Sequence, residues 1–267
     1  MFRSWGNNIE KINVYILQGS MPHFLMAILL LLIAARAEYP YQASVKLDVP
    51  LAIGATSALA FGLYRLHAMA PGDTLYNRND LLPWDRPFAG TWNEPAIFAS
   101  NILMIAGAMP LVFGMRQDFA VHTLMLYEVL ALQGGLQLMA RSMKVWPRPF
   151  MLGSEGGKER DNPSSHGSFY SGHASAAFAL AVFTGIWFSD TYPGSSYSPW
   201  VWAGALSVAA LTGILRVAGG KHYPSDVLVG ALAGSFAGWV VPMLHRNSSD
   251  KGSPAVVPGY IGWRWSF

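Results

Sequence analysis

The stretch VLVGALAGSFAGWVVPML, residues 227–244, contains no ionisable side chain and approaches the roughly 20 residues that a helix needs to cross a bilayer. Glycines recur in it at every fourth position, at 230, 234 and 238, and therefore share one face of a helix. A stripe of small residues lets a second helix approach closely, and we expect that helix to come from the same chain. The stretch predicts a membrane-spanning helix.

Six more segments of similar length and composition lie between loops rich in Pro, Gly, Asn and Asp. The segments are Met21–Ala37, Pro50–Ala70, Ala96–Met115, Phe119–Ala140, Gly172–Phe188 and Trp200–Leu215. Helices are expected for all of them, because an open sheet leaves backbone groups unpaired in lipid. Glu128, an acidic residue inside the fourth of the seven segments, is attributed to helix packing rather than to a proton relay.

The composition agrees with a membrane location. Of the 267 residues, 52% are hydrophobic and 12% are charged, against roughly 25% charged residues in soluble domains. The absence of cysteine excludes disulfides, thiol catalysis and cysteine-ligated metal sites. A net charge of +3 without a Lys/Arg run argues against nucleic acid as a partner. We predict an all-α fold, an integral-membrane helical bundle of six or seven transmembrane helices in a lipid bilayer.

The first apolar segment has two interpretations. Basic residues precede it, and Ala35-Arg36-Ala37 has the small-x-small form of a signal peptide cleavage site. The long polar region before the segment and the arginine inside the motif favour a retained helix instead. We expect N-terminal membrane helices and a polar loop over residues 1–95, a catalytic membrane core over residues 96–246 and a C-terminal tail over residues 247–267.

Ionisable residues gather in three short stretches beside the ends of the apolar segments. The stretches are RSMKVWPRP at residues 141–149, YSGH at residues 170–173 and RVAGGKHYPSD at residues 216–226. The first follows the fourth apolar segment, the second begins the fifth, and the third joins the sixth to the seventh. All three are therefore expected at one membrane face. Because buried charge is costly in a membrane, the cluster predicts an active site at that face.

The residue types in these stretches suit a phosphate group. Arginine forks bind phosphoryl oxygens in a bidentate manner, and backbone N–H groups at a helix start add donors and a favourable dipole. The candidates for phosphate binding are Arg141, Lys144, Arg148, Ser171, Gly172 and Arg216. For Arg141 and Lys144 taken singly, anchoring at the membrane interface is an equally good explanation.

The spacing within the third stretch adds chemistry to binding. His222 and Asp226 are four residues apart, so a helical turn brings the carboxylate to one ring nitrogen and leaves the other as a nucleophile. Pro224 suits the first turn of that helix, and Ser225 or Asp226 can cap it. His173 then protonates the leaving oxygen and later activates water. With several cations and one carboxylate, the site is a poor divalent-metal cage, so neither a metal nor a cofactor is expected there.

In these motifs the sequence resembles the type 2 phosphatidic acid phosphatase superfamily, which also contains vanadium haloperoxidases and bacterial acid phosphatases. Its signature is Lys, six residues, Arg-Pro; then Pro-Ser-Gly-His; then Ser-Arg, five residues, His, three residues, Asp. The chain follows this order and spacing, with Arg141, Tyr170 and Leu215 in place of the signature lysine, proline and serine. Lys144 is an alternative source of the missing amine.

The resemblance implies that His222 attacks phosphorus to form a phosphohistidine, that Asp226 orients it and that His173 protonates the leaving alcohol. It implies a membrane-embedded, metal-independent phosphatase acting on a lipid phosphate or an isoprenoid pyrophosphate. A vanadate-dependent, haloperoxidase-like oxidoreductase is an alternative that the many spans disfavour. A non-catalytic lipid-binding or transport protein is another, disfavoured by the intact histidines and aspartate. No oligomeric state is predicted.

The basic residues outside the phosphate-binding stretches indicate which side of the membrane the active site faces. With seven spans, the side of the site has Arg3, Lys11, Arg78 and Arg86, and the other side has Arg36, Lys46, Arg116, Arg246, Lys251 and Arg264. Cytoplasmic loops carry the excess of Lys and Arg. We therefore expect a bacterial inner-membrane protein whose active site faces the periplasm or the exterior.

Overall fold

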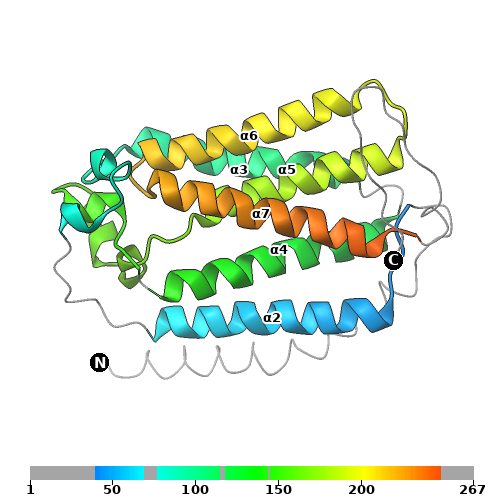
Figure 1. The fold of residues 1–267 in the computed structure, drawn as a ribbon, viewed down its shortest axis with the longest axis horizontal. Helices are drawn as coiled ribbons and strands as arrows, with labels where there is room; N and C mark the ends of the chain where they lie inside the picture. Colours follow the sequence, from blue (N-terminus) through cyan, green and yellow to red (C-terminus); the bar gives the residue numbers. More distant parts are fainter. Residues whose placement is uncertain (1–39, 69–76, 115–117, 144, 248–267) are drawn as a thin grey trace, which may run out of the picture.

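The structure is a computed structural model that describes residues 40–68, 77–114, 118–143 and 145–247. These residues form the long helices α2 (Val45–His67), α3 (Glu94–Gly114), α4 (Phe119–Ser142), α5 (Gly172–Thr191), α6 (Ser198–Ala218) and α7 (Pro224–His245). The helices run side by side along the long axis of the molecule (Figure 1). The predicted all-α bundle is confirmed for the described residues, whereas the first apolar segment and most of the C-terminal tail lie outside them.

Helix α5 lies at the centre of the bundle. It packs most extensively against α7 and α6, while α3 covers α6 and α4 joins α2 to the rest. Figure 1 shows α2 and α4 along one edge of the bundle and α6 along the opposite edge. A buried apolar cluster between α4, α5 and α7 includes Val121, Met125, Val129, Leu180, Phe183 and Val241. The helices that carry the predicted site therefore share one core.

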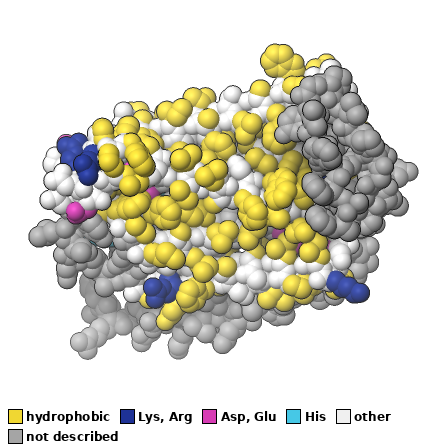
Figure 2. Space-filling view, in the orientation of Figure 1, with side chains coloured by type: hydrophobic (Ala, Val, Ile, Leu, Met, Phe, Trp, Pro, Cys, Tyr) yellow, Lys and Arg dark blue, Asp and Glu magenta, His cyan; other side chains and the backbone are white. Residues whose placement is uncertain are grey.

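The outward faces of the helices are strongly apolar. Large exposed side chains on them include Phe61, Phe98, Ile105, Ile214, Leu232 and Phe236. Figure 2 shows hydrophobic side chains spread across the middle of one face, with Lys and Arg towards the two ends. Five helices, α2 and α4 to α7, are long and apolar enough to cross a membrane, and α3 contains a shorter apolar stretch. Because so large an apolar surface is unfavourable in water, the chain is an integral membrane protein.

Helix α2 begins five residues earlier than the apolar pattern predicted, at Val45 rather than Pro50. Polar residues in its first turn interrupt the pattern. One of them, Asp48, accepts a 2.6 Å hydrogen bond through Oδ2 from the backbone N–H of Ser44 and so holds the helix start. Pro50 lies inside the helix in its second turn, where its missing N–H removes one intrahelical hydrogen bond.

The glycine stripe of α7 lies directly against the backbone of α5. A Cβ added at Gly230, Gly234 or Gly238 would lie 2.6, 1.9 or 2.2 Å from a carbonyl oxygen of α5 or its N-cap. Atoms cannot approach so closely, so only glycine permits this separation of the two helices. The prediction that the stripe packs within one chain is confirmed.

We expect Gly234→Ala to destabilise the protein, because the new Cβ would force α5 and α7 apart. Overpacking of this kind costs about 1–3 kcal/mol, or roughly 2–8 °C in the thermal midpoint of a chain of this size. Intrinsic fluorescence during heating in detergent measures it. Gly54→Ala on α2 is the matched control, because nothing lies within 4 Å of a Cβ there. Equal midpoints for the two variants would contradict the close packing.

Candidate active site

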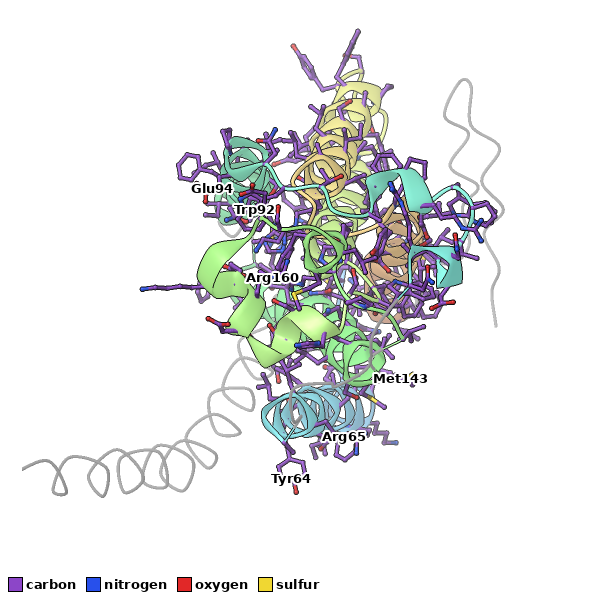
Figure 3. The ribbon with its side chains drawn as sticks, turned by 90° about the vertical axis from the view of Figure 1, so that its left-hand side faces the viewer. Tyr64, Arg65, Trp92, Glu94, Met143 and Arg160 are labelled. Atoms are coloured by element: carbon purple, nitrogen blue, oxygen red, sulfur yellow. The ribbon has the colours of Figure 1, made fainter. Side chains whose placement is uncertain are left out.

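The three predicted stretches meet at one end of the bundle, on the left in Figure 1. The short 3-10 helices η3 (Pro149–Leu152), η4 (Gly157–Asp161) and η5 (Pro163–His166) lie in the connection between α4 and α5. Figure 3 looks onto this end and shows Arg160 and Trp92 among the covering segments. The Arg160 guanidinium fixes the connection by donating to the carbonyl oxygens of residues 150, 151, 153 and 155. The predicted meeting of the stretches at one face is confirmed.

His222 and Asp226 face each other across the start of α7. The distance from Nδ1 of His222 to Oδ2 of Asp226 is 3.6 Å. Ser168 lies beside both, because its Oγ is 3.4 Å from that Nδ1 and donates a 2.5 Å hydrogen bond to Oδ2. Pro224 occupies the first turn, and Asp226 caps the helix by accepting a 3.0 Å hydrogen bond from the N–H of Tyr223. The two side chains therefore lie close together as the spacing predicted, but His222 precedes the N-cap Tyr223 and is not itself part of the helix.

The Asp226 carboxylate is fully buried and firmly oriented. Besides the Ser168 hydroxyl and the Tyr223 N–H on Oδ2, the indole N–H of Trp146 donates a 3.0 Å hydrogen bond to Oδ1. Three donors fix the plane of the carboxylate and hold its charge next to His222. Sequence reasoning missed Trp146 and Ser168, although both lie in or between the first two polar stretches.

His222 is suited to act as a nucleophile. Its side chain is almost completely buried, and this burial lowers the pKa of its imidazole well below the usual value. The positive charges of Arg148 and Arg216 lower the pKa further. The ring is therefore neutral at pH 7. With Nδ1 turned to Asp226 and Ser168, the lone pair of the neutral ring is on Nε2.

Arg148 and Arg216 form a buried cationic cluster beside His222. The Nε atoms of both side chains lack a hydrogen-bond partner in the structure. Burial, together with the positive charges of Arg141 and Arg216, lowers the pKa of Arg148 to about 9. Unpaired buried donors and like charges are both unfavourable. An oxyanion would supply the missing acceptors and compensate the charge, so the cluster is suited to bind a phosphoryl group.

The Arg141 side chain forms hydrogen bonds with the connection between α4 and α5. Its Nε donates to the carbonyl oxygen of Gly167 at 3.3 Å, and its Nη2 donates to that of Ser164 at 2.8 Å. These contacts place the guanidinium at the site end and hold the connection in position. Lys144, the alternative cation, lies outside the described residues. The phosphate-binding roles of both residues stay predictions.

The start of α5 presents the second polar stretch to the site. Ser171 is the N-cap residue, and its Oγ accepts a 3.4 Å hydrogen bond from the N–H of Ala174. Gly172 begins the helix and packs closely against Gln137. A Cβ added at Gly172 would lie 3.1 Å from the Gln137 side chain. Both residues therefore lie where the helix N-terminus favours an anion.

His173 is held by a residue that sequence reasoning missed. Its Nε2 is 2.9 Å from Oδ1 of Asn101 on α3, which is an acceptor only. The neighbouring Ser100 contributes its Oγ as an acceptor for Nη1 of Arg216 at 3.3 Å. Ser100 and Asn101 are two adjacent polar residues inside an otherwise apolar segment. Their polarity was the signal in the sequence that could have marked them as part of the site. Helix α3 thus completes the site.

Lys221 closes one side of the cationic cluster. Its Nζ is 2.9 Å from Oε2 of Glu159 and lies over the rings of Trp92 and Phe150, 4.9 and 5.0 Å from their centroids. The hydrogen bond from Lys221 lowers the pKa of the Glu159 carboxyl. The carboxylate thus ties η4 to the turn before α7, beside two aromatic rings.

Taken together, these residues define a class of protein: an integral membrane protein with two histidines, an orienting carboxylate and buried arginines at one end of its bundle. Residues 122–250 match the family model of the PAP2 superfamily. The matched residues include all three motifs, and the resemblance seen in them is confirmed.

Two known proteins show the extent of the similarity. Over 95 residues the chain is 35% identical to the Lipid A 1-phosphatase of Porphyromonas gingivalis, a match that covers 34% of this chain and 20% of that relative. The match therefore spans only a fifth of the relative's length. The crystal structure of a transmembrane PAP2 type phosphatidylglycerolphosphate phosphatase from Bacillus subtilis is also similar, with 21% identity and a TM-score of 0.40. That similarity covers 83% of this chain and 92% of the solved one.

Proposed function

We propose that the protein is a metal-independent phosphatase that hydrolyses a lipid phosphate or an isoprenoid pyrophosphate through a phosphohistidine. The observation that carries the proposal is a neutral, buried His222 close to the Asp226 carboxylate and to the buried guanidinium groups of Arg148 and Arg216, whose Nε atoms lack a hydrogen-bond partner. A nucleophile beside an anion-binding cluster is the arrangement that phosphoryl transfer requires. The match of residues 122–250 to the PAP2 superfamily model supports the same class of reaction.

In the first step, Nε2 of His222 attacks phosphorus, and the bond from phosphorus to the leaving oxygen breaks. His173 donates its proton to that oxygen, so a lipid phosphate releases a neutral alcohol and an isoprenoid pyrophosphate releases the protonated monophosphate. The negative charge of the substrate favours the protonated form of His173 before this transfer. Arg148 and Arg216 compensate the charge on the equatorial phosphoryl oxygens, while Asp226 stabilises the imidazolium of His222.

In the second step, water replaces His222 on phosphorus. His173, now neutral, takes a proton from the water, whose oxygen attacks phosphorus as the phosphorus–nitrogen bond breaks. Inorganic phosphate and the neutral His222 are the products. Because Asn101 accepts a hydrogen bond from Nε2 of His173, the transferred proton is carried on Nδ1.

The position of the site favours a substrate with an apolar tail. The site lies at the end of a bundle whose outward faces are apolar, so the phosphate can reach the arginines while the tail stays in the bilayer (Figures 1 and 2). Trp92 and Phe150 add aromatic surface next to Lys221. The relative named Lipid A 1-phosphatase makes lipid A the first substrate to test.

The proposal is tested by purifying the protein in detergent and measuring phosphate release from four substrates in the presence of EDTA. The substrates are lipid A, phosphatidic acid, phosphatidylglycerol phosphate and an isoprenoid pyrophosphate. We expect release from at least one of them, retained in EDTA and lost in His222→Ala. No release from any substrate, or an absolute requirement for added divalent metal, would overturn the proposal.

Inorganic phosphate should stabilise the protein, and Arg148→Met should weaken this effect. A ligand at 100 times its Kd stabilises by about 2.7 kcal/mol, which raises the thermal midpoint by several degrees. Arg148→Met removes a buried charge that its neighbours repel, so its midpoint without phosphate should be higher than in the wild type. Arg65 is an exposed arginine of α2 at the same end (Figure 3). The control variant Arg65→Met should therefore keep the full shift in thermal midpoint on addition of phosphate. An undiminished shift in Arg148→Met would contradict phosphate binding there.

We also propose that the active site faces away from the cytoplasm of a bacterial inner membrane, as the distribution of Lys and Arg suggests. Helix α7 begins at the site and ends at the opposite end of the bundle, so a fusion after Phe267 reports on the opposite side. We expect a fluorescent cytoplasmic reporter to be active in that fusion and an alkaline phosphatase reporter to be inactive. The reverse result would place the site in the cytoplasm.

A further inference from the structure

A second group of ionisable residues lies at the end of the bundle opposite to the active site. It consists of Asp48 in the first turn of α2, Glu128 in α4 and His245 at the end of α7, and all three are 0% exposed. Helix α7 separates His245 from the active site by about 33 Å, at 1.5 Å per residue. The proposed phosphatase chemistry uses none of these side chains, so their burial needs another explanation.

The three side chains converge on one point. Nε2 of His245 is 3.0 Å from Oδ1 of Asp48 and 3.2 Å from Oε2 of Glu128. The three atoms that face one another all lie within 4.8 Å. For metal bonds of about 2.0–2.2 Å, neighbouring ligand atoms in tetrahedral or octahedral geometry are about 3.0–3.5 Å apart. The two measured separations fall within this range.

The other polar atoms of the group hold the ligands in position. Nδ1 of His245 is 2.8 Å from the carbonyl oxygen of Val241, so Nδ1 carries the proton and Nε2 has the lone pair in a neutral ring. The second oxygen of Asp48 accepts a hydrogen bond from the N–H of Ser44. Metal-binding histidines and carboxylates are commonly oriented by such partners.

A proton alone accounts poorly for the arrangement. Nε2 of His245, Oδ1 of Asp48 and both carboxylate oxygens of Glu128 lack an aligned hydrogen bond despite the short separations. A protonated His245 would balance only one of the two carboxylates. A protonated Glu128 could donate to Nε2 of a neutral His245, but Oδ1 of Asp48, 3.0 Å from the same nitrogen, would then lack a donor. An unbalanced charge or unpaired group at this depth is costly, whereas a divalent cation neutralises two carboxylates.

We propose that Asp48, Glu128 and His245 bind a divalent transition-metal ion such as Zn²⁺ or Mn²⁺. One imidazole nitrogen with carboxylate oxygens suits these ions better than Mg²⁺ or Ca²⁺, which prefer oxygen ligands alone. The second, unpartnered oxygen of Glu128 provides a fourth donor if the carboxylate binds through both oxygens. The ion would link α2, α4 and α7. It would lie far from the proposed phosphate site, and no metal is expected at that phosphate site. Its role is structural.

Metal content tests the proposal on the full-length protein, purified in detergent with an affinity tag that contains no histidines. After loading with Zn²⁺ or Mn²⁺ and desalting, mass spectrometry of the metal should find one ion per chain in the wild type. Asp48→Asn and His245→Gln should lower the affinity at least tenfold, because each removes a ligand. Asp190→Asn is the matched control, since Asp190 lies at the same end but pairs with Arg246.

A spectroscopic measurement on the wild type keeps the test decisive if a variant does not fold. Co²⁺ bound to three or four protein nitrogen and oxygen ligands should give visible absorption bands that Zn²⁺ displaces. Inactive His222→Ala should bind metal like the wild type, so failure of the phosphatase proposal is distinguishable from failure of this one. A wild type without metal, or equal metal content in His245→Gln and Asp190→Asn, would overturn the metal site.

Discussion

His222→Ala is expected to lower the rate of phosphate release by at least about 10⁴-fold, because the variant lacks the proposed nucleophile and cannot form the proposed covalent intermediate. The arginine cluster stays in place, so the thermal stabilisation by phosphate should persist. Initial rates with the preferred lipid phosphate, measured beside the phosphate-induced shift in thermal midpoint, give both quantities from one preparation. Loss of turnover with retained binding is the result that assigns a chemical role to His222.

The matched control is His166→Ala, which removes a histidine of η5 at the same end of the bundle. His166 has no part in the proposed chemistry, and its replacement should change the rate by only a few-fold. A His222→Ala variant that keeps a tenth or more of the wild-type rate would show that another group attacks phosphorus.

Asp226→Asn is expected to lower kcat by about 10³–10⁴-fold, in line with the loss of an orienting aspartate from a catalytic triad. Asparagine has nearly the same shape, but its amide cannot balance the imidazolium that forms at His222. Its NH₂ group can also favour the wrong tautomer of the ring. Because the Asp226 carboxylate is fully buried and its proposed role is to orient His222, KM should change little. Steady-state kinetics over a range of lipid concentrations separate the two constants.

Trp146→Phe provides the comparison for Asp226→Asn. It removes one hydrogen bond to the carboxylate but keeps the charge and the two donors on the other oxygen. Its kcat should fall by about 100-fold at most, since a hydrogen bond to a charged group is worth about 1.5–3 kcal/mol and the remaining donors retain part of the orientation. A larger loss in Trp146→Phe than in Asp226→Asn would contradict the role given to the carboxylate charge.

Features that depend on near neighbours in the sequence were predictable. The glycine stripe of α7 predicted close packing, and the four-residue spacing of His222 and Asp226 predicted that their side chains lie close together. Pro224 marked the start of the helix correctly. These predictions rest on helical periodicity and on capping, which act within a few residues.

Contacts between distant parts of the chain were not predictable in the same way. Asn101 and His173 are 72 residues apart, and Trp146 and Asp226 are 80 apart. No spacing rule connects such pairs, because the packing of whole helices brings them together. Only the polarity of Asn101 within an apolar segment hinted at a role.

The buried group at the far end of the bundle shows the same limit. Asp48 and His245 lie near the ends of their helices, where polar residues are ordinary, and Glu128 was attributed to helix packing. Each residue is unremarkable by itself in the sequence. Their convergence on one point becomes visible only when α2, α4 and α7 are packed together.

The most direct test of the proposed mechanism is to identify the residue that carries the phosphoryl group. In His173→Asn the second step should be slow, so an aryl phosphate, whose leaving group needs no proton, should label the enzyme with ³²P. We expect the label to be stable in base, labile in acid and located on His222 by mass spectrometry of the digested protein. Label on any other residue, or label that survives in acid, would contradict nucleophilic attack by His222.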